Sequence, residues 1–526
     1  MSESMTTTAV PPSRTRREIY VAMSGLMLGM LLAMLDNLIV STALPTIVGD
    51  LGGLAHLSWV VTAYALATAA ATPLWGKLGD IYGRKGMFMT AIVVFLIGSA
   101  LAGLSQSMDQ LIAFRALQGV GAGGLMVGAM AILGDLVPPR ERGRYQGLIG
   151  GMMPLAFVGG PLLGGLLTDH LSWRWAFYIN IPLGLAALLV TALVMRIPRV
   201  RRPARIDYVG AVLLTAGVVA LTLVASWGGT EYAWGSAVII SLAVVAVSAL
   251  VAFVFAERRV AEPILPPRMF RDRNFTVAQV LSFLVGAVMF GAMNFLPQYL
   301  QNVQGVSSTA SGLLTLPLMF AMLAVMLITG QITTRTGHFR SFPILGGLFM
   351  TAGLLVLLML DVGTPLVLAS GLTAVLGIGM GFLMQNTMLI TQNSVDLRDM
   401  GAASGSVSLF RTIGGSLGVA LLGSVFTSRV TDTLVTRLGA AGHRLVDGGA
   451  QLPPSVVAKL PAPIRDAFET AIVHGLHGVL IGAAALAAVA FAAAWFIRAV
   501  PLRGGAAPEP GPRPDREPAR EPSAVA

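Results

Sequence analysis

Long apolar stretches separated by short polar segments make up most of the chain from residue 19 onward. An α-helix needs about 20 apolar residues to cross the hydrocarbon core of a bilayer, and fourteen stretches are of this order. They cover 19–46, 57–76, 87–106, 109–136, 146–168, 175–195, 207–226, 235–256, 275–299, 309–333, 342–360, 364–391, 402–427 and 472–497. The pattern predicts an all-α integral membrane protein with 14 transmembrane helices and both chain ends on one side.

The composition supports this class. Of the 526 residues, 55% are hydrophobic and only 11% are charged, whereas soluble proteins carry about 25% charged residues. The chain has no cysteine, so neither a disulfide framework nor thiol chemistry is expected. The first 18 residues are polar, and the apolar run after them is too long for the core of a signal peptide.

The net charge of +10 reflects membrane topology. Of the 35 lysines and arginines, 27 lie at the chain ends or in the loops on the same side as the ends. Because basic loops stay in the cytoplasm, we expect both termini to be cytoplasmic and the protein to be a multi-pass protein of the plasma or inner membrane. A nucleic-acid partner is not expected.

The chain repeats itself. Gly119, Gly121 and Gly123 in the fourth span align with Gly377, Gly379 and Gly381 in the twelfth span, at an offset of 258 residues. The segments that follow spans 2 and 10 align at an offset of 254. Two parallel copies around a central site are a transporter architecture, and spans 7 and 8 form an inserted pair between the copies.

The repeat gives a domain organisation. Residues 1–18 form a cytoplasmic N-terminus, 19–198 an N-terminal six-helix bundle, and 199–273 a linker with two extra transmembrane helices and a cytoplasmic surface segment. Residues 274–498 form a C-terminal six-helix bundle with an external loop at 429–470, and 499–526 form a disordered cytoplasmic tail, because they are rich in proline, alanine and charged residues.

Asp36 is the main chemical anomaly. It interrupts the first span, where the 17 residues before it carry no charge and the next acid is Asp50. An ionisable side chain inside a span is costly and is a functional-site candidate by default. It lies about ten residues, or roughly 15 Å, inside the outer end of its span, and Arg115 of span 4 lies at roughly 9 Å.

Three segments resemble motifs of the major facilitator superfamily. Gly76-Lys77-Leu78-Gly79-Asp80-Ile81-Tyr82-Gly83-Arg84-Lys85 resembles its signature loop, and the stretch around Arg115 resembles its intramembrane arginine motif. Ala156 to Gly165, with Gly159, Gly160, Pro161, Gly164 and Gly165, resembles its antiporter motif. A further segment, Leu35 to Pro45, is similar to the first helix of the fourteen-spanner drug:proton antiporters of this superfamily, which are of the multidrug efflux type.

This resemblance implies a fold and a function. The fold would be two six-helix bundles of the major facilitator type plus two linker helices. The function would be proton-coupled efflux of lipophilic drugs, antibiotics or related small molecules by alternating access. Such a protein is not an enzyme, needs no cofactor beyond the proton gradient, works in the lipid bilayer and is expected to be a monomer.

The expected site residues fall into four groups. Asp36 and Arg115 would couple transport to protons, because burial favours a protonated carboxyl and a nearby guanidinium favours an ionised one. Gly76, Asp80, Gly83, Arg84 and Lys85 would form a cytoplasmic gate, and the antiporter motif would shape a moving helix joint. The substrate cavity would include Asn37, Tyr64, Gln118, Asn294, Gln298, Gln385, Asn386 and Arg411. No metal site is expected.

Two other functions stay open from the sequence. One is a transporter of the same fold that imports its substrate or carries a specific lipid or natural product, although the antiporter motif argues against import. The other is a non-transporting membrane sensor or scaffold. The sequence leaves open the substrate, its charge, the proton stoichiometry and the partner of Arg411.

Overall fold

The computed structural model describes residues 16–51, 57–137, 139–195, 207–229, 231–260, 262–439 and 461–502. Within these ranges the chain is helical apart from short connections, and no β-strand is formed. The N-terminal tail, most of the expected external loop and most of the C-terminal tail lie outside the described residues.

Each of the fourteen expected spans coincides with one helix or with a pair of consecutive helices. In the first half these are α1 (Arg16–Leu51), α2 (Leu57–Tyr82), α3 (Arg84–Leu104), α4 (Met108–Leu136), α5 (Pro139–Gly150) with α6 (Met152–His170), and α7 (Trp175–Tyr178) with α8 (Asn180–Val194). The linker pair is α9 (Tyr208–Trp227) and α10 (Ala237–Glu257). In the second half they are α11 (Arg273–Asn302), α12 (Ser308–Leu314) with α13 (Leu316–Thr336), α14 (Ser341–Val356), α15 (Leu366–Asn393), α16 (Met400–Leu438) and α19 (Ala462–Ala494).

Twelve helical stretches in the described part of the chain are long and apolar enough to cross a membrane. The two remaining expected spans are α2 and the α5–α6 pair, which are helical over most of their expected range. The all-helical membrane class is therefore confirmed, and fourteen helical crossings agree with the hydropathy pattern.

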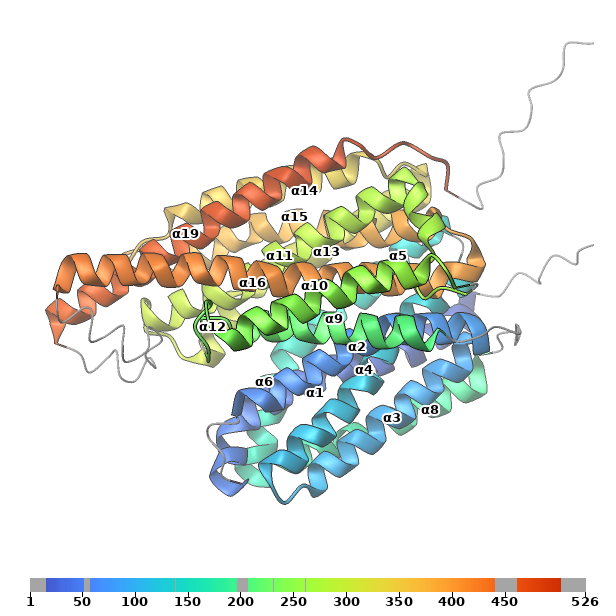
Figure 1. Ribbon diagram of the computed structural model, residues 1–526, viewed down its shortest axis with the longest axis horizontal. Coiled ribbons are helices and arrows are strands. Elements are labelled where there is room, and N and C mark those ends of the chain that lie inside the picture. Colours follow the sequence, from blue (N-terminus) through green and yellow to red (C-terminus); the bar gives the residue numbers. More distant parts are fainter. Residues whose placement is uncertain are drawn as a thin grey trace, which may run out of the picture.

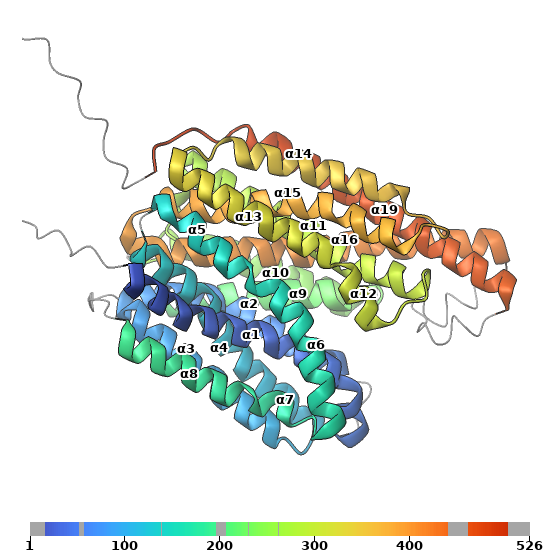
Figure 2. The same cartoon turned by 180° about the vertical axis from the view of Figure 1, so that it is seen from behind.

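The helices gather in two halves (Figures 1 and 2). In the first half α4 packs on α2 and α3, and α1 packs on α6 and α8. In the second half α15 packs on α13 and α14, and α16 packs on α11 and α19. The start of α1 and the end of α19 lie at one end of the molecule, which we call the terminal end; the opposite end is the far end.

The same glycine packing occurs in both halves. A Cβ atom on Gly119 or Gly123 would collide with the backbone of α2, and a Cβ atom on Gly377 or Gly381 would collide with the backbone of α13. Gly121 and Gly379 meet the backbones of α3 and α14 in the same way. The repeated glycines therefore let α4 and α15 approach their neighbours closely, as small residues do in membrane helix interfaces.

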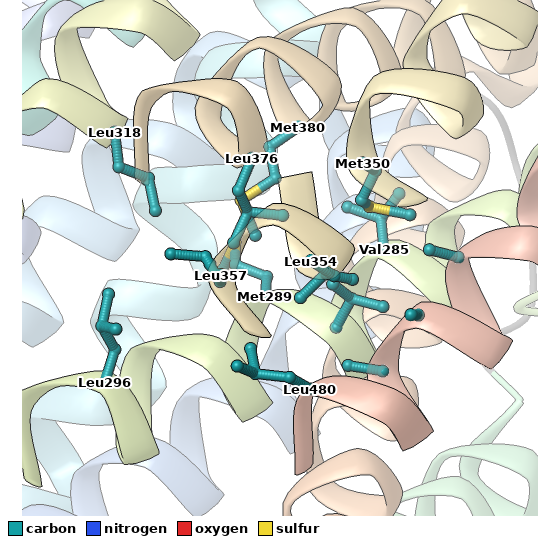
Figure 3. Packing of buried hydrophobic residues seen from close by; sticks show 14 of the residues in the cluster. Val285, Met289, Leu296, Leu318, Met350, Leu354, Leu357, Leu376, Met380 and Leu480 are labelled. Carbon is teal, nitrogen blue, oxygen red and sulfur yellow. The ribbon is translucent and has the colours of Figure 1, made fainter. Parts of the chain in front are cut away.

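A large apolar core fills the second half. It joins α11, α13, α14, α15 and α19 through close-packed leucine, methionine and valine side chains (Figure 3). Met350, Leu354, Leu376 and Met380 are fully buried there. Interhelical packing of this kind positions the helices that face the first half.

The two halves touch at the terminal end. Helices α2 and α16 cross at Gly76 and Gly401, where a Cβ atom on Gly76 would lie 2.6 Å from the carbonyl oxygen of Gly401. Gln392 Nε2 of α15 donates to the carbonyl of Met130 in α4 at 3.4 Å. Toward the far end the two halves diverge (Figure 1).

The expected external loop at 429–470 is helical at both of its ends. Helix α16 continues to Leu438, and α19 begins at Ala462. The hydropathy pattern marks only the apolar part of each helix, whereas the polar extensions are held together by side-chain contacts. Thr433 Oγ1 lies 3.2 Å from His474 Nδ1, and Arg437 Nη1 donates to Thr470 Oγ1 at 3.1 Å.

The segment after α10 joins the linker to both halves. Its residues Ile264, Leu265 and Met269 are buried against the protein. Lys77 of α2 forms an ion pair with Glu262 at 3.0 Å, and Arg268 forms one with Asp399 at 2.8 Å. The apolar residues of this segment thus pack on the protein, not outward from it.

Candidate functional site

The carboxylate of Asp36 lies at the centre of the first half. Its side chain has no solvent exposure. Arg115 Nη1 donates to Oδ2 at 2.5 Å, while Gln118 Nε2 and Asn180 Nδ2 both donate to Oδ1 at 2.7 Å. A buried carboxylate needs a cation and further donors to offset the loss of hydration, and Asp36 has both.

Arg115 has its own set of partners. Its Nη1 donates to Gln118 Oε1 at 2.9 Å, and its Nε donates to the carbonyl of Val60 at 3.3 Å. The guanidinium lies over the ring of Tyr64, 4.1 Å from the ring centroid, which is a cation–π geometry. Because these contacts do not involve Asp36, Arg115 keeps partners when the carboxyl is protonated.

Five helices bring the site together. Asp36 comes from α1, Tyr64 from α2, Ser99 from α3, Arg115 from α4 and Asn180 from α8. Asn180 Nδ2 also donates to Ser99 Oγ at 3.0 Å, and Ser99 Oγ donates to the carbonyl of Phe177 at 2.8 Å. A change in the charge of Asp36 would therefore alter contacts with most helices of the first half.

The antiporter motif places α6 directly against the helix that carries Asp36. A Cβ atom on Gly160 would overlap Leu38, and one on Gly164 would overlap Thr42. Gly159 lies near Leu35, and Gly165 has open space around it. Pro161 lies within α6, and its side chain is outside the described residues. The motif thus sets how closely α6 packs on the turns that follow Asp36.

Two members of the site were missed by the sequence analysis. Asn180 and Ser99 both lie in otherwise apolar spans. A signal was present, since polar residues inside apolar spans usually face other helices. The residues that Asn180 and Ser99 contact could not be predicted, because the sequence does not give the rotation of each helix about its axis.

The residues expected in a substrate cavity are divided between the two halves of the protein. Tyr64 and Gln118 belong to the Asp36 cluster, and Asn37 is the neighbour of Asp36 with a buried amide oxygen. Gln385 and Asn386 are buried in α15. The others are Asn294, which is exposed, and Gln298 and Arg411, which are half-buried.

Within the described part of the chain, some of the expected gate residues contact the second half, and others contact only the first half. Asp80 accepts hydrogen bonds from Arg84 Nη2 at 2.8 Å and from the backbone N–H groups of Gly401 at 3.0 Å and Ala402 at 2.9 Å. Arg84 also forms an ion pair with Asp135. Asp80 therefore joins the two halves by placing a negative charge on the N-terminus of α16, where the helix dipole favours an anion.

Among the described residues, Gly83 and Lys85 make contacts only within the first half, at and near the hairpin between α2 and α3. Gly83 has a φ of +101°, which favours glycine, and it connects α2 to α3. Its repeat counterpart Gly337 has a φ of +71° at the end of α13. Lys85 Nζ donates to the carbonyls of Ala192 and Met195 at 2.7 Å. Both acceptors belong to the first half, so Lys85 secures the end of α8, away from the contact between the halves.

A second charged group lies at the far end of α1. Asp50 accepts hydrogen bonds from Trp173 Nε1 at 2.8 Å and from Arg174 Nη1 at 3.0 Å. These bonds, with that from Trp173 the larger influence, lower the pKa of the Asp50 carboxyl below its usual value. Asp50 is thus held ionised, in contrast to what a proton carrier requires.

The described residues contain no group of three or more side chains that could hold a metal ion. His477 Nε2 lies 2.8 Å from the carbonyl of Leu360, and His474 contacts Thr433. Both histidines therefore have partners within the protein.

Comparison with known proteins places this geometry in a family. The family model of the Major Facilitator Superfamily matches residues 26–212 and 198–419. The multidrug transporter protein MdtP of Bacillus subtilis is 35% identical over 503 residues, which cover 91% of this chain and 93% of the relative. An uncharacterized MFS-type transporter of Mycobacterium tuberculosis is 43% identical over 496 residues, which cover 93% of this chain and 71% of the relative.

Solved structures share the fold at low sequence identity. The human organic anion transporter MFSD10 has a TM-score of 0.56 and 16% identity, with 92% of this chain and 100% of that chain covered. The proton:xylose symporter XylE has a TM-score of 0.55 and 16% identity, with 89% and 95% covered. The fourteen helical crossings, the repeated halves and the extent of the family match together show that the chain belongs to the major facilitator superfamily of membrane transporters, in which its relatives include proteins named as multidrug transporters.

Proposed function

We propose that the protein exports lipophilic small molecules in exchange for protons, by alternating access of the two halves. The observation that carries the proposal is the Asp36–Arg115 pair, which is fully buried in the first half and held by donors from several helices. The names of the relatives, which include multidrug transporters and efflux pumps, support the direction of transport.

The chemistry follows from the contacts of the pair. An ionised Asp36 is satisfied by Arg115, Gln118 and Asn180. Protonation of Asp36 removes the charge that attracts these donors, while Arg115 keeps Val60, Gln118 and Tyr64 as partners. The protonated and ionised states therefore favour different packing of α1 against α4 and α8, and α6 follows α1 through its glycines.

The orientation is part of the proposal. The terminal end carries most of the basic loops, and we assign it to the cytoplasm because basic loops are retained there. The contacts of Asp80 with α16, and of the linker segment with Lys77 and Asp399, then lie on the cytoplasmic side. Together they hold the cytoplasmic side closed while the external side is open.

The test is Asp36→Asn in the purified full-length protein reconstituted in liposomes. Asparagine keeps the size of the side chain but cannot carry the proton. We expect efflux of a fluorescent lipophilic dye driven by a pH gradient to fall to the level of protein-free liposomes. The fold should be retained, as judged by size-exclusion chromatography, because Arg115 keeps its other partners.

Asp50→Asn provides the matched control. It neutralises another acid of the same helix, at an exposed position outside the apolar part of α1. This variant should transport at the wild-type rate. A pH gradient that drives dye efflux equally well in Asp36→Asn and in the wild type would refute the assignment of Asp36.

A further inference from the structure

Arg411 lies inside α16 without any counter-ion. It is the twelfth residue of this helix, within an apolar span. No hydrogen bond or ion pair to its side chain is formed within the described part of the chain, and its Nε atom is buried without a partner. Arginine stays charged at any physiological pH, so its position requires an explanation.

The face of α16 that carries Arg411 passes from α15 to α11. Ser404 lies seven residues earlier, which is two turns away on the same helix face. Ser404 Oγ accepts a hydrogen bond from Gln392 Nε2 of α15, and the same nitrogen donates to Met130 of the first half. Gly418, seven residues after Arg411, packs on Ala287 of α11. Arg411 therefore lies between the part of this face that is close to the first half and the part that α11 covers.

Helix α11 approaches α16 closely at Arg411. Gly286 of α11 lies against the backbone of Arg411, where a Cβ atom would overlap the carbonyl group. One turn further along α16, Gly415 contacts the ring of Phe290, which is 39% exposed. Arg411 is half-buried and thus lies one helical turn from the site of an accessible aromatic side chain.

We propose that Arg411 is a substrate subsite for the anionic end of an amphiphilic molecule, a carboxylate or another oxyanion attached to an apolar aromatic body. The planar guanidinium offers paired N–H donors that match an oxyanion. An unpaired cation in a low-dielectric setting attracts an anion more strongly than it would in water. Phe290 supplies an apolar surface beside it. This proposal rests on the proposed export function and adds the chemical class of the substrate.

Two dyes that differ only in the anionic group provide the probes. Rhodamine B carries a free carboxylate, and its ethyl ester has the same ring system and cationic charge without that carboxylate. Efflux of each dye is measured in liposomes that contain the full-length protein, under one fixed pH gradient. We expect the wild type to have a lower KM for rhodamine B than for the ester.

Arg411→Gln removes the charge and keeps much of the side-chain length. We expect it to raise the KM for rhodamine B by about tenfold or more, which corresponds to about 1.4 kcal/mol, and to leave the KM for the ester nearly unchanged. The control is Arg429→Gln on the same helix, where the arginine is exposed. It should leave both KM values unchanged.

The outcomes separate this proposal from the proposed function. An unchanged ratio of the two KM values in Arg411→Gln, with dye efflux still dependent on Asp36, overturns the subsite alone. Efflux that does not depend on Asp36 overturns proton coupling, whatever the ratio. If Arg411→Gln does not fold, Arg411→Lys decides, because it keeps the charge and loses the paired donors; a KM ratio equal to that of the wild type then contradicts the subsite.

Discussion

At the scale of single residues, Asn180 holds the carboxylate of Asp36 in place. It donates to the same carboxylate oxygen as Gln118 does, and the same Asn180 nitrogen also donates to Ser99. A hydrogen bond to a charged group contributes about 1.5–3 kcal/mol. Asn180 is therefore a positioning residue, whose loss should weaken the site without removing it.

Asn180→Ala gives the corresponding prediction. With one donor fewer, the carboxylate of Asp36 is held less firmly beside Arg115. We expect dye efflux driven by a pH gradient to fall by about tenfold and to stay above the level of Asp36→Asn, as measured in liposomes.

Ser99→Ala is the control for this substitution. It removes a contact to Asn180 and leaves the three donors to Asp36 in place, so its efflux should fall less. Efflux at the wild-type rate in Asn180→Ala would contradict the positioning role.

At this scale, the charged residues of the site could be predicted from the sequence, and the neutral polar residues could not. Asp36 and Arg115 stood out because charges are rare inside spans, and their similar depth predicted that they lie close together. Ser99 and Asn180 could not be assigned, because neutral polar side chains inside helices can also satisfy their own backbone. Their roles, and those of Asp36 and Arg115, stay predictions until transport is measured.

At the scale of helices, the crossing of α2 and α16 is one of the close contacts between the halves, together with the packing of α5 on α13. Gly76 and Gly401 face each other there, and Asp80 caps α16 one turn further on. Any side chain at Gly401 would collide with the backbone of Gly76 or with the carboxylate of Asp80. Closure of the terminal end therefore requires glycine at this crossing.

Gly401→Val should hold this end open. We expect the distance between spin labels attached at positions 86 and 340, measured by pulsed electron paramagnetic resonance, to be longer than in the wild-type background. Dye efflux should be lost. Because the chain has no cysteine, single cysteines can be introduced for labelling without removing native ones.

Gly79→Ala is the matched control for this crossing. A Cβ atom on Gly79 meets Arg84 at an ordinary 3.7 Å, so the distance distribution should match that of the wild type. If Gly401→Val gave the same distribution as this control, the glycine crossing would not determine closure.

Helix existence could be predicted well, and helix ends could not. Apolar length alone located the helices. The ends of α16 and α19 lie in polar sequence, where Thr433, Arg437, His474 and Thr470 stabilise the paired helices. Hydropathy carries no information about such contacts, because they depend on the partner helix.

At the scale of the whole molecule, the start of α1 and the end of α19 lie at the terminal end, and the proposed orientation assigns this end to the cytoplasm. The hairpin between α9 and α10 lies at the opposite side of the membrane in this arrangement. A membrane-impermeant maleimide should label Gly235→Cys in intact cells and should label Arg259→Cys only after the membrane is opened. Both positions are exposed, and the reverse labelling pattern would contradict the proposed orientation.

The linker pair also makes the molecule asymmetric toward the surrounding lipid. Helix α9 packs against both α2 and α16, so the α9–α10 hairpin covers the joint between the halves on one flank (Figure 1). On the other flank, α5 packs directly on α13, and α6 lies beside α12 and α13 further toward the far end (Figure 2); within the described part of the chain no helix pair like α9–α10 covers this joint.

The edges of this second flank are apolar, with Leu155 and Leu162 of α6 and Phe320 of α13 largely exposed. A compound dissolved in the bilayer therefore meets two unequal flanks: the hairpin covers one, and the other presents the apolar edges of α6 and α13 to the lipid. If substrate is taken from the bilayer, we expect it to approach along the flank on which α6 packs against the Asp36 helix.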